Sequence, residues 1–108
     1  MYRLGVAALM VGLGALNAVA AEPSAAERSE LIRLLKHDCG ACHGMRLTGG
    51  LGPPLTVRAL AHKSPDALRA AIWDGRPAAG MPPWRGILSQ QQVDWLVDRL
   101  RGGIDARD

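Results

Sequence analysis

Three segments of the chain carry apolar residues at helical spacing, and each follows a residue type that caps helices. The first helix is predicted to run from about Ala25 to about His37. Ser24 and Glu27 have the spacing of a capping box, which satisfies free backbone amides at a helix start. The apolar stripe of this helix consists of Leu31, Leu34 and Leu35.

The second and third helices have clear start and stop signals. Ser64-Pro65 is a cap followed by proline at the first helical position, and Gly75 is the stop. Ser89 and Gln92 repeat the capping pattern for the third helix, which Gly102-Gly103 ends. The apolar stripes are Leu68, Ala71 and Ile72 in the second helix and Val93, Leu96, Val97 and Leu100 in the third.

Two loops rich in glycine and proline separate these helices, Gly44 to Pro54 and Gly75 to Gly86. Neither loop has the alternation of a strand, and β-branched residues are sparse. The pattern therefore predicts an all-α fold with three main helices and long loops. Loops of this length without secondary structure of their own usually have a function.

Residues 1–20 have the composition of a signal peptide. Arg3 gives a positive start, Leu4 to Val19 is an apolar run, and Ala18-Val19-Ala20 is a small-x-small cleavage signal. The alternative is a membrane anchor, but the apolar run is shorter than the roughly 20 residues that span a bilayer, and no basic cluster follows it. We therefore expect cleavage, export, no stable membrane insertion afterwards, and one domain over residues 21–108.

The composition favours a small domain with a bound group. The net charge of the 108-residue chain is +3, which falls by one with Arg3 and is too small for a nucleic-acid binder. Residues 21–108 contain no phenylalanine or tyrosine, and their aromatic residues are Trp73, Trp84 and Trp95. A domain only slightly longer than about 80 residues gains little stability from a core with so few aromatic residues. A stabilising cross-link or a large buried cofactor is therefore expected.

Both cysteines lie in Cys39-Gly40-Ala41-Cys42-His43, directly after the first predicted helix. A thioredoxin-like redox pair needs a βαβ context, and a zinc site needs two more ligands where only His37 and His62 remain. A structural disulfide leaves His43 unexplained. The spacing C-x-x-C-H is the signature of covalent haem attachment, in which both thiols add to the haem vinyl groups and the histidine lies under the iron. We therefore predict one haem c.

With this motif, the chain resembles the class I c-type cytochromes over essentially all of residues 21–108. The family carries Gly-Pro-x-Leu in the loop after the haem histidine, matched here by Gly52-Pro53-Pro54-Leu55. The resemblance implies the class I cytochrome c fold around one haem. It also implies that the Pro53 carbonyl accepts a hydrogen bond from the far ring nitrogen of His43. The alternative interpretation of this segment is an ordinary proline turn.

Met81 is the predicted second iron ligand. Met45 is only two residues from His43, on the same side of the ring, so it does not reach the opposite face. Met81 lies in Gly80-Met81-Pro82-Pro83-Trp84, where prolines restrict the backbone, and this segment resembles the methionine loop of the family. The rival ligands His37 and His62 are expected at the surface, the former at a helix end whose dipole favours an imidazolium.

Other side chains are expected near the haem without being specific for it. Six apolar residues are predicted to pack around the ring, and all of them fit a plain core equally well: Leu35, Leu55, Leu68, Ile72, Trp84 and Leu96. Trp95 lies off the main stripe of its helix and is expected at the junction with the first helix. Four arginines are candidates for binding the haem propionates or steering an acidic partner, and the alternative for them is a solvated surface: Arg46, Arg58, Arg76 and Arg85.

Iron bound by histidine and methionine has no vacant position, which favours one-electron transfer over enzymatic chemistry. The segments 38–53, 74–77 and 81–84 resemble the NirC subgroup, small periplasmic cytochromes of denitrifying bacteria. That resemblance implies a periplasmic carrier that exchanges electrons with cytochrome cd-type nitrite reductase or with haem d1 maturation proteins. The alternatives are a generic periplasmic donor to a terminal oxidase and a five-coordinate haem protein that binds a gas or peroxide. A monomer or a domain-swapped dimer is expected, because the loop Gly75 to Gly86 can serve as a hinge.

Overall fold

The computed structural model describes residues 22–104 and five isolated positions before them, residues 5, 7, 9, 12 and 14. The predicted signal peptide therefore lies, apart from those positions, outside the described residues. In the described part of the chain, no helix has the length and hydrophobicity of a transmembrane segment.

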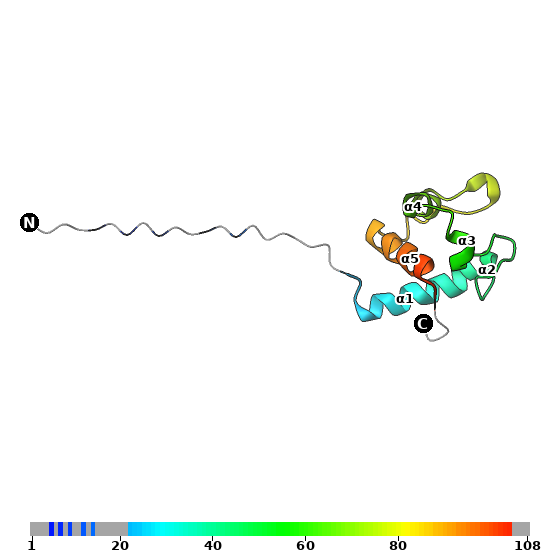
Figure 1. The fold of residues 1–108 in the computed structure, drawn as a ribbon, viewed down its shortest axis with the longest axis horizontal. Coiled ribbons are helices and arrows are strands. Elements are labelled where there is room, and N and C mark those ends of the chain that lie inside the picture. The colour runs from blue at the N-terminus through cyan, green and yellow to red at the C-terminus, as the bar shows by residue number, and fades with distance from the viewer. Residues whose placement is uncertain are drawn as a thin grey trace, which may run out of the picture.

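The first helix is longer than predicted. It consists of α1 (Ala25–Leu34), a π-helical segment (Leu35–Cys39) and α2 (Gly40–His43), which follow one another directly (Figure 1). The prediction that it ends near His37 was wrong. The wider π turn keeps the backbone hydrogen-bonded, with the Gly40 amide donating to the Leu35 carbonyl, so the polar residues after Leu35 do not interrupt it. The helix ends at Gly44, whose φ of 91° is accessible mainly to glycine.

The cap at the start of α1 is half of the predicted capping box. The Glu27 amide donates to the Ser24 hydroxyl oxygen at 3.2 Å. The Glu27 carboxylate accepts from the Ser24 hydroxyl at 3.4 Å, whereas a complete box would have it accept from the Ser24 backbone amide.

The second and third predicted helices are confirmed as α4 (Pro65–Asp74) and α5 (Gln90–Gly102). Ser64 caps α4, since its hydroxyl accepts from the Ala67 amide at 3.1 Å. Ser89 and Gln92 form the complete capping box at the start of α5. Gly75 and Gly103 follow the two helices with φ of 68° and 90°, so the residue types that predicted the boundaries also make them.

Two short helices were not predicted. Thr56 caps α3 (Val57–Leu60) by accepting from the Ala59 amide at 3.2 Å, and a 3-10 turn covers Pro77–Ala79. Helices of three or four residues are too short for a periodic apolar stripe. Over residues 22–104 no strand forms, and an isolated bridge pairs Arg76 with Met81.

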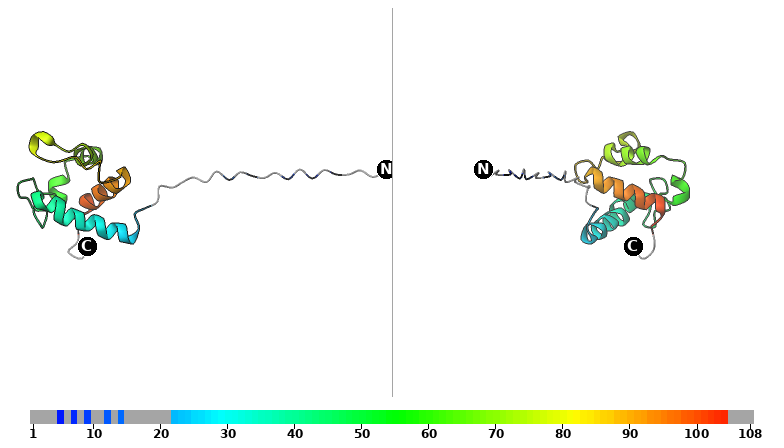
Figure 2. Two further views of the ribbon diagram at one scale, coloured as in Figure 1. Left: turned by 180° about the vertical axis from the view of Figure 1, so that it is seen from behind. Right: turned by 60° about the vertical axis from the view of Figure 1, so that its left-hand side comes forward.

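The helices stack so that α5 lies between α1 and α4, as Figures 1 and 2 show. The core joins the three predicted stripes with leucines from the loops and from α3; its buried members are Leu31, Leu35, Leu47, Leu60, Leu68, Leu88, Val93, Leu96, Val97 and Leu100. Trp73, Trp84 and Trp95 are partly buried against this core. The all-α fold is therefore confirmed, and the two long loops emerge from it at the ends of α2 and α4.

Candidate haem-binding site

The two cysteines lie at the end of the first helix in different surroundings. Cys39 is half-buried against the core, Cys42 is exposed, and both are free thiols. Burial, and then the negative charge of Asp38, raise the pKa of the Cys39 thiol to about 11. Redox-active cysteine pairs depend on a thiol with a lowered pKa, so the environment of Cys39 disfavours the thioredoxin-like interpretation.

The His43 side chain has one ring nitrogen committed and one available. Its Nδ1 atom lies 2.6 Å from the Pro53 carbonyl oxygen. A carbonyl only accepts, so Nδ1 carries the proton and donates, and the lone pair of the neutral ring is on Nε2. This is the contact that the family resemblance implied. It fixes the tautomer and the orientation in which a histidine binds a metal.

Gly52 makes this contact sterically feasible. A Cβ atom at Gly52 would lie 2.8 Å from both Nδ1 and Cε1 of His43, closer than real Cβ atoms approach other atoms. The Gly52 amide donates to the Cys42 carbonyl at 2.8 Å, and the Gly49 amide donates to the His43 carbonyl at 2.8 Å. The loop after α2 thus caps the last carbonyls of the helix and packs against the ring. The motif predicted a role for Pro53 and none for Gly52, although this glycine directly precedes Pro53 in the same motif.

Met81 is held through its backbone. Its carbonyl accepts from the Arg76 amide at 2.9 Å, and its amide donates to the Arg76 carbonyl at 3.1 Å. Gly75 lies against this segment so closely that a Cβ atom there would be 2.7 Å from the Met81 carbonyl oxygen. The Trp84 amide donates to the Ile72 carbonyl at 3.0 Å, which ties the methionine loop to the last turns of α4.

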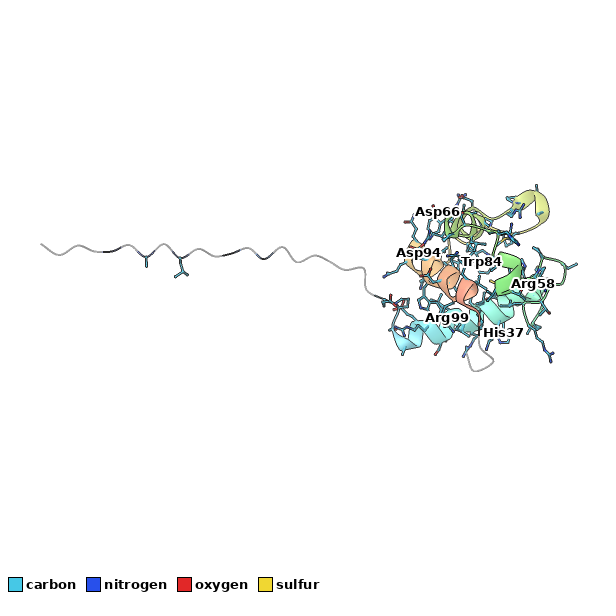
Figure 3. All side chains as sticks on the ribbon, in the orientation of Figure 1. His37, Arg58, Asp66, Trp84, Asp94 and Arg99 are labelled. Carbon is cyan, nitrogen blue, oxygen red and sulfur yellow. The ribbon has the colours of Figure 1, made fainter. Side chains whose placement is uncertain are left out.

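The rival ligands lie elsewhere. Met45 is 62% exposed, and its sulfur is 3.8 Å from where a Gly40 Cβ atom would be, beside the start of α2. His37 and His62 are exposed, as expected, and Figure 3 labels His37 on the first helix. In the described part of the chain no group of three or more His, Cys, Asp or Glu side chains is arranged to hold a metal ion.

The apolar residues predicted around a haem ring form two sets. Leu35, Leu68 and Leu96 are buried core members, whereas Leu55, Ile72 and Trp84 pack against the core and stay partly exposed. Partly exposed apolar side chains, a histidine with a free Nε2 atom and two free thiols are what a flat, apolar, covalently attached group requires. The residues present therefore fit a haem c.

The four candidate arginines also separate into two sets. Arg85 lies 3.3 Å from Asp74 in an exposed ion pair. Arg46, Arg58 and Arg76 are exposed and form no ion pair with the described residues. These three side chains keep their charge available for a ligand or a partner.

Comparison with known proteins decides the family. The protein family described as "Cytochrome C oxidase, cbb3-type, subunit III" matches residues 26–98. The chain belongs to the class I c-type cytochromes. It is therefore a small c-type cytochrome, an electron carrier of a family whose members bind haem c covalently.

The relatives of this cytochrome point to one subgroup. Cytochrome c55X of Stutzerimonas stutzeri is 50% identical over 101 residues, which cover 94% of this chain and 88% of that protein. The solved structure of the c-type cytochrome NirC is 52% identical, with a TM-score of 0.72, and the match covers 74% of this chain and 94% of the other. The resemblance to the NirC subgroup is therefore confirmed. Dihydro-heme d1 dehydrogenase of Pseudomonas aeruginosa is 37% identical over 98 residues, which cover 91% of this chain but 18% of that protein.

Proposed function

We propose that this cytochrome is a periplasmic one-electron carrier with a single haem c, attached through Cys39 and Cys42 and bound axially by His43 and Met81. The observation that carries the proposal is the 2.6 Å contact between His43 Nδ1 and the Pro53 carbonyl oxygen. It leaves Nε2 as the only ring nitrogen able to bind iron. The signal-like segment 1–20 supports export to the periplasm.

The protein residues have three tasks in this proposal. The bound haem supplies a one-electron couple between ferric and ferrous iron. The Pro53 carbonyl orients the His43 ring and strengthens it as a donor. Met81 would supply the second ligand to the iron, and a thioether ligand would favour the reduced state and leave no site for a gas, peroxide or other substrate. This arrangement supports a carrier and not an enzyme.

We further propose that the redox partners are proteins of the nitrite reductase system, either cytochrome cd-type nitrite reductase or the proteins that complete its haem d1. Two comparisons support this proposal. The chain is 52% identical to a structure named NirC, and most of the chain matches a segment of a protein named dihydro-heme d1 dehydrogenase. A generic donor to a terminal oxidase is a second candidate, supported by the family description that names a cbb3-type oxidase subunit.

The axial ligands are tested with matched methionine variants of the exported protein. Met81→Ala is expected to abolish the methionine-to-iron absorption band, lower the reduction potential and admit carbon monoxide to the reduced iron. Met45→Ala is the control and is expected to change none of these, because Met45 is exposed beside Gly40. A spectrum that Met81→Ala leaves unchanged, or a colourless wild-type protein, would contradict the proposal.

The partner assignment is tested by stopped-flow electron exchange with purified cytochrome cd-type nitrite reductase, dihydro-haem d1 dehydrogenase and a cbb3-type oxidase. Faster exchange with either of the first two proteins than an unrelated c-type cytochrome achieves is the expected result. Faster exchange with the oxidase alone would favour the second candidate.

A further inference from the structure

The helix α4 is attached to the rest of the molecule by few buried side chains. Its one buried residue is Leu68, at 7% exposure, whereas α5 has four buried residues. Ile72 and Trp73 pack against the core and stay partly exposed. Burial of apolar area is the main force that holds one helix against another. The position of α4 therefore depends more on its other contacts than the position of α5 does.

An open groove lies between α4 and α5. It has a volume of about 440 Å³, and its lining residues come from α4 and from the first turns of α5: Arg69, Ala70, Trp73, Gln90, Val93 and Asp94. Apolar packing between the two helices is therefore incomplete on this side. A contact that joins α4 to α5 here has to span the groove, and the two charged residues of its lining, Arg69 and Asp94, make such a contact.

Arg69 makes two ion pairs, one within α4 and one across to α5. Its Nη1 atom donates to Asp66 Oδ1 at 2.6 Å, and Asp66 belongs to the same helix. Its Nε atom, which is buried, lies 2.6 Å from Asp94 Oδ1 on α5. Figure 3 labels the two aspartates on these neighbouring helices. The guanidinium of Arg69 thus joins the two helices through Asp94 and is oriented by Asp66.

The methionine loop is attached to the last turn of α4. The Trp84 amide donates to the Ile72 carbonyl at 3.0 Å, and the Arg85 amide donates to the Trp73 carbonyl at 3.4 Å. Ile72 and Trp73 follow Arg69 by about one turn of the same helix. A shift of α4 away from α5 would therefore carry the methionine loop with it.

We infer that Arg69 is a positioning residue for Met81, the proposed second iron ligand, because its ion pair with Asp94 holds α4 against α5 and α4 holds the methionine loop. The flexible thioether of Met81 reaches the iron only while the backbone of the loop stays in place. Loss of the ion pair would leave the buried Nε atom of Arg69 without this carboxylate and increase the fraction of molecules in which the loop is displaced. The inference rests on the proposed function, since it concerns the ligation of the same iron.

The test measures how readily imidazole replaces Met81 in the haem-loaded ferric protein. Imidazole binds the iron after the methionine sulfur has left, so its apparent affinity increases with the fraction of molecules in which the loop is displaced. Arg69→Gln and Asp94→Asn are each expected to raise this affinity about fivefold, measured by loss of the methionine-to-iron absorption band. The double variant is expected to bind imidazole no more tightly than either single variant, because both substitutions remove the same pair.

Two control variants separate positioning from other roles. Asp66→Asn removes the contact of Arg69 within α4 and keeps the one across to α5, so the imidazole affinity is expected to stay within about twofold of wild type. Leu31→Val shortens a core side chain of α1 that is 4% exposed. It is expected to lower the urea midpoint of global unfolding without raising the imidazole affinity. Asp94→Asn keeps Arg69 and its contact with Asp66, so it carries the test if Arg69→Gln does not fold.

Each contrary outcome has a distinct meaning. Imidazole affinities of Arg69→Gln and Asp94→Asn within about twofold of wild type would show that the pair does not position the ligand, and the carrier function would stand. An equal increase in Asp66→Asn or in Leu31→Val would assign the effect to the local charge or to global stability, which also overturns the inference. A wild-type protein without the methionine-to-iron band would defeat the proposed ligation itself.

Discussion

The two glycine-proline loops hold their candidate iron ligands in different ways. The loop after α2 contacts the His43 side chain itself, through the Pro53 carbonyl and the face of Gly52. The loop after α4 holds Met81 through paired backbone hydrogen bonds with Arg76. The orientation of the histidine ring is therefore set by contacts to the ring itself, whereas the contacts of the methionine fix its backbone and leave its side chain flexible.

This difference has a physical basis in the two side chains. An imidazole binds a metal along one direction in the ring plane, so its rotation must be set by a second contact. A thioether on a flexible chain reaches a range of positions, so a fixed backbone suffices. Substitutions in the first loop are therefore expected to change the electronic properties of the ligand, and those in the second loop to change the shape of the loop.

The largest effect is expected at Gly75, in the second loop. A Cβ atom there would lie 2.5 to 2.7 Å from three backbone atoms of residues 81–83, and φ is 68°. Because backbone cannot move aside as a side chain can, Gly75→Ala is expected to lower the free energy of unfolding by about 3 kcal/mol. Urea unfolding measures this loss. The control Gly86→Ala meets no atom within 4 Å and is expected to change stability by less than about 1 kcal/mol; equal losses would contradict the account of the second loop.

The next effect is expected at Leu47, which anchors the first loop in the core. Its side chain is 7% exposed, so Leu47→Ala is expected to cost about 2–3 kcal/mol in the free energy of unfolding. Leu51→Ala in the same loop is the matched control and is expected to stay within about 0.5 kcal/mol. If thermal unfolding gave the two variants similar stabilities, the loop would not be held by burial of Leu47.

A smaller effect with a second signature is expected at Gly52. The atoms that a new Cβ would meet belong to the His43 ring, which can shift at the expense of its hydrogen bond to Pro53. Gly52→Ala is expected to cost about 1.5 kcal/mol of stability. In the haem-loaded protein the reduction potential is expected to rise, because a weaker imidazole donor stabilises ferric iron less. Redox titration measures the potential, and an unchanged value would mean that the Pro53 contact does not tune the ligand.

The smallest effect is expected at the ion pair that links the second loop to α4. Arg85 and Asp74 lie 3.3 Å apart with side chains 59% and 61% exposed. Exposed pairs contribute little, so Asp74→Asn is expected to cost less than about 0.5 kcal/mol, and less still at high salt. Asp98→Asn is the control, since Asp98 forms no ion pair with the described residues. A loss above about 1 kcal/mol for Asp74→Asn alone would show that the pair helps to hold the loop.

Capping residues and terminating glycines in the sequence predicted the helices whose ends these same residues form. Ser64 and Pro65 begin α4, Ser89 and Gln92 begin α5, and the glycines after both helices end them. The motif ending in His43 predicted the attachment site by spacing alone. The contact of His43 with Pro53 followed from the family resemblance, because ten residues of irregular loop have no periodicity from which to derive it.

The periodic pattern predicted neither the end of the first helix nor every member of the core. A π turn carries the helix past Lys36, His37 and Asp38, which read as a polar end in sequence. Leu47 and Leu60, outside any predicted stripe, complete the core. Such residues are identified as core members by their burial, and burial depends on which segments pack together.

The sequence by itself determined the three main helices and the loops between them, and it predicted the residues for haem attachment, because caps, stripes and the C-x-x-C-H spacing act over a few residues. Only the tertiary structure decided that Gly52 packs on the His43 ring, that Arg76 pairs with Met81, and that Leu47 is buried while Leu51 is exposed. Two leucines in one loop are identical in hydrophobicity. What separates them is which one the rest of the chain covers.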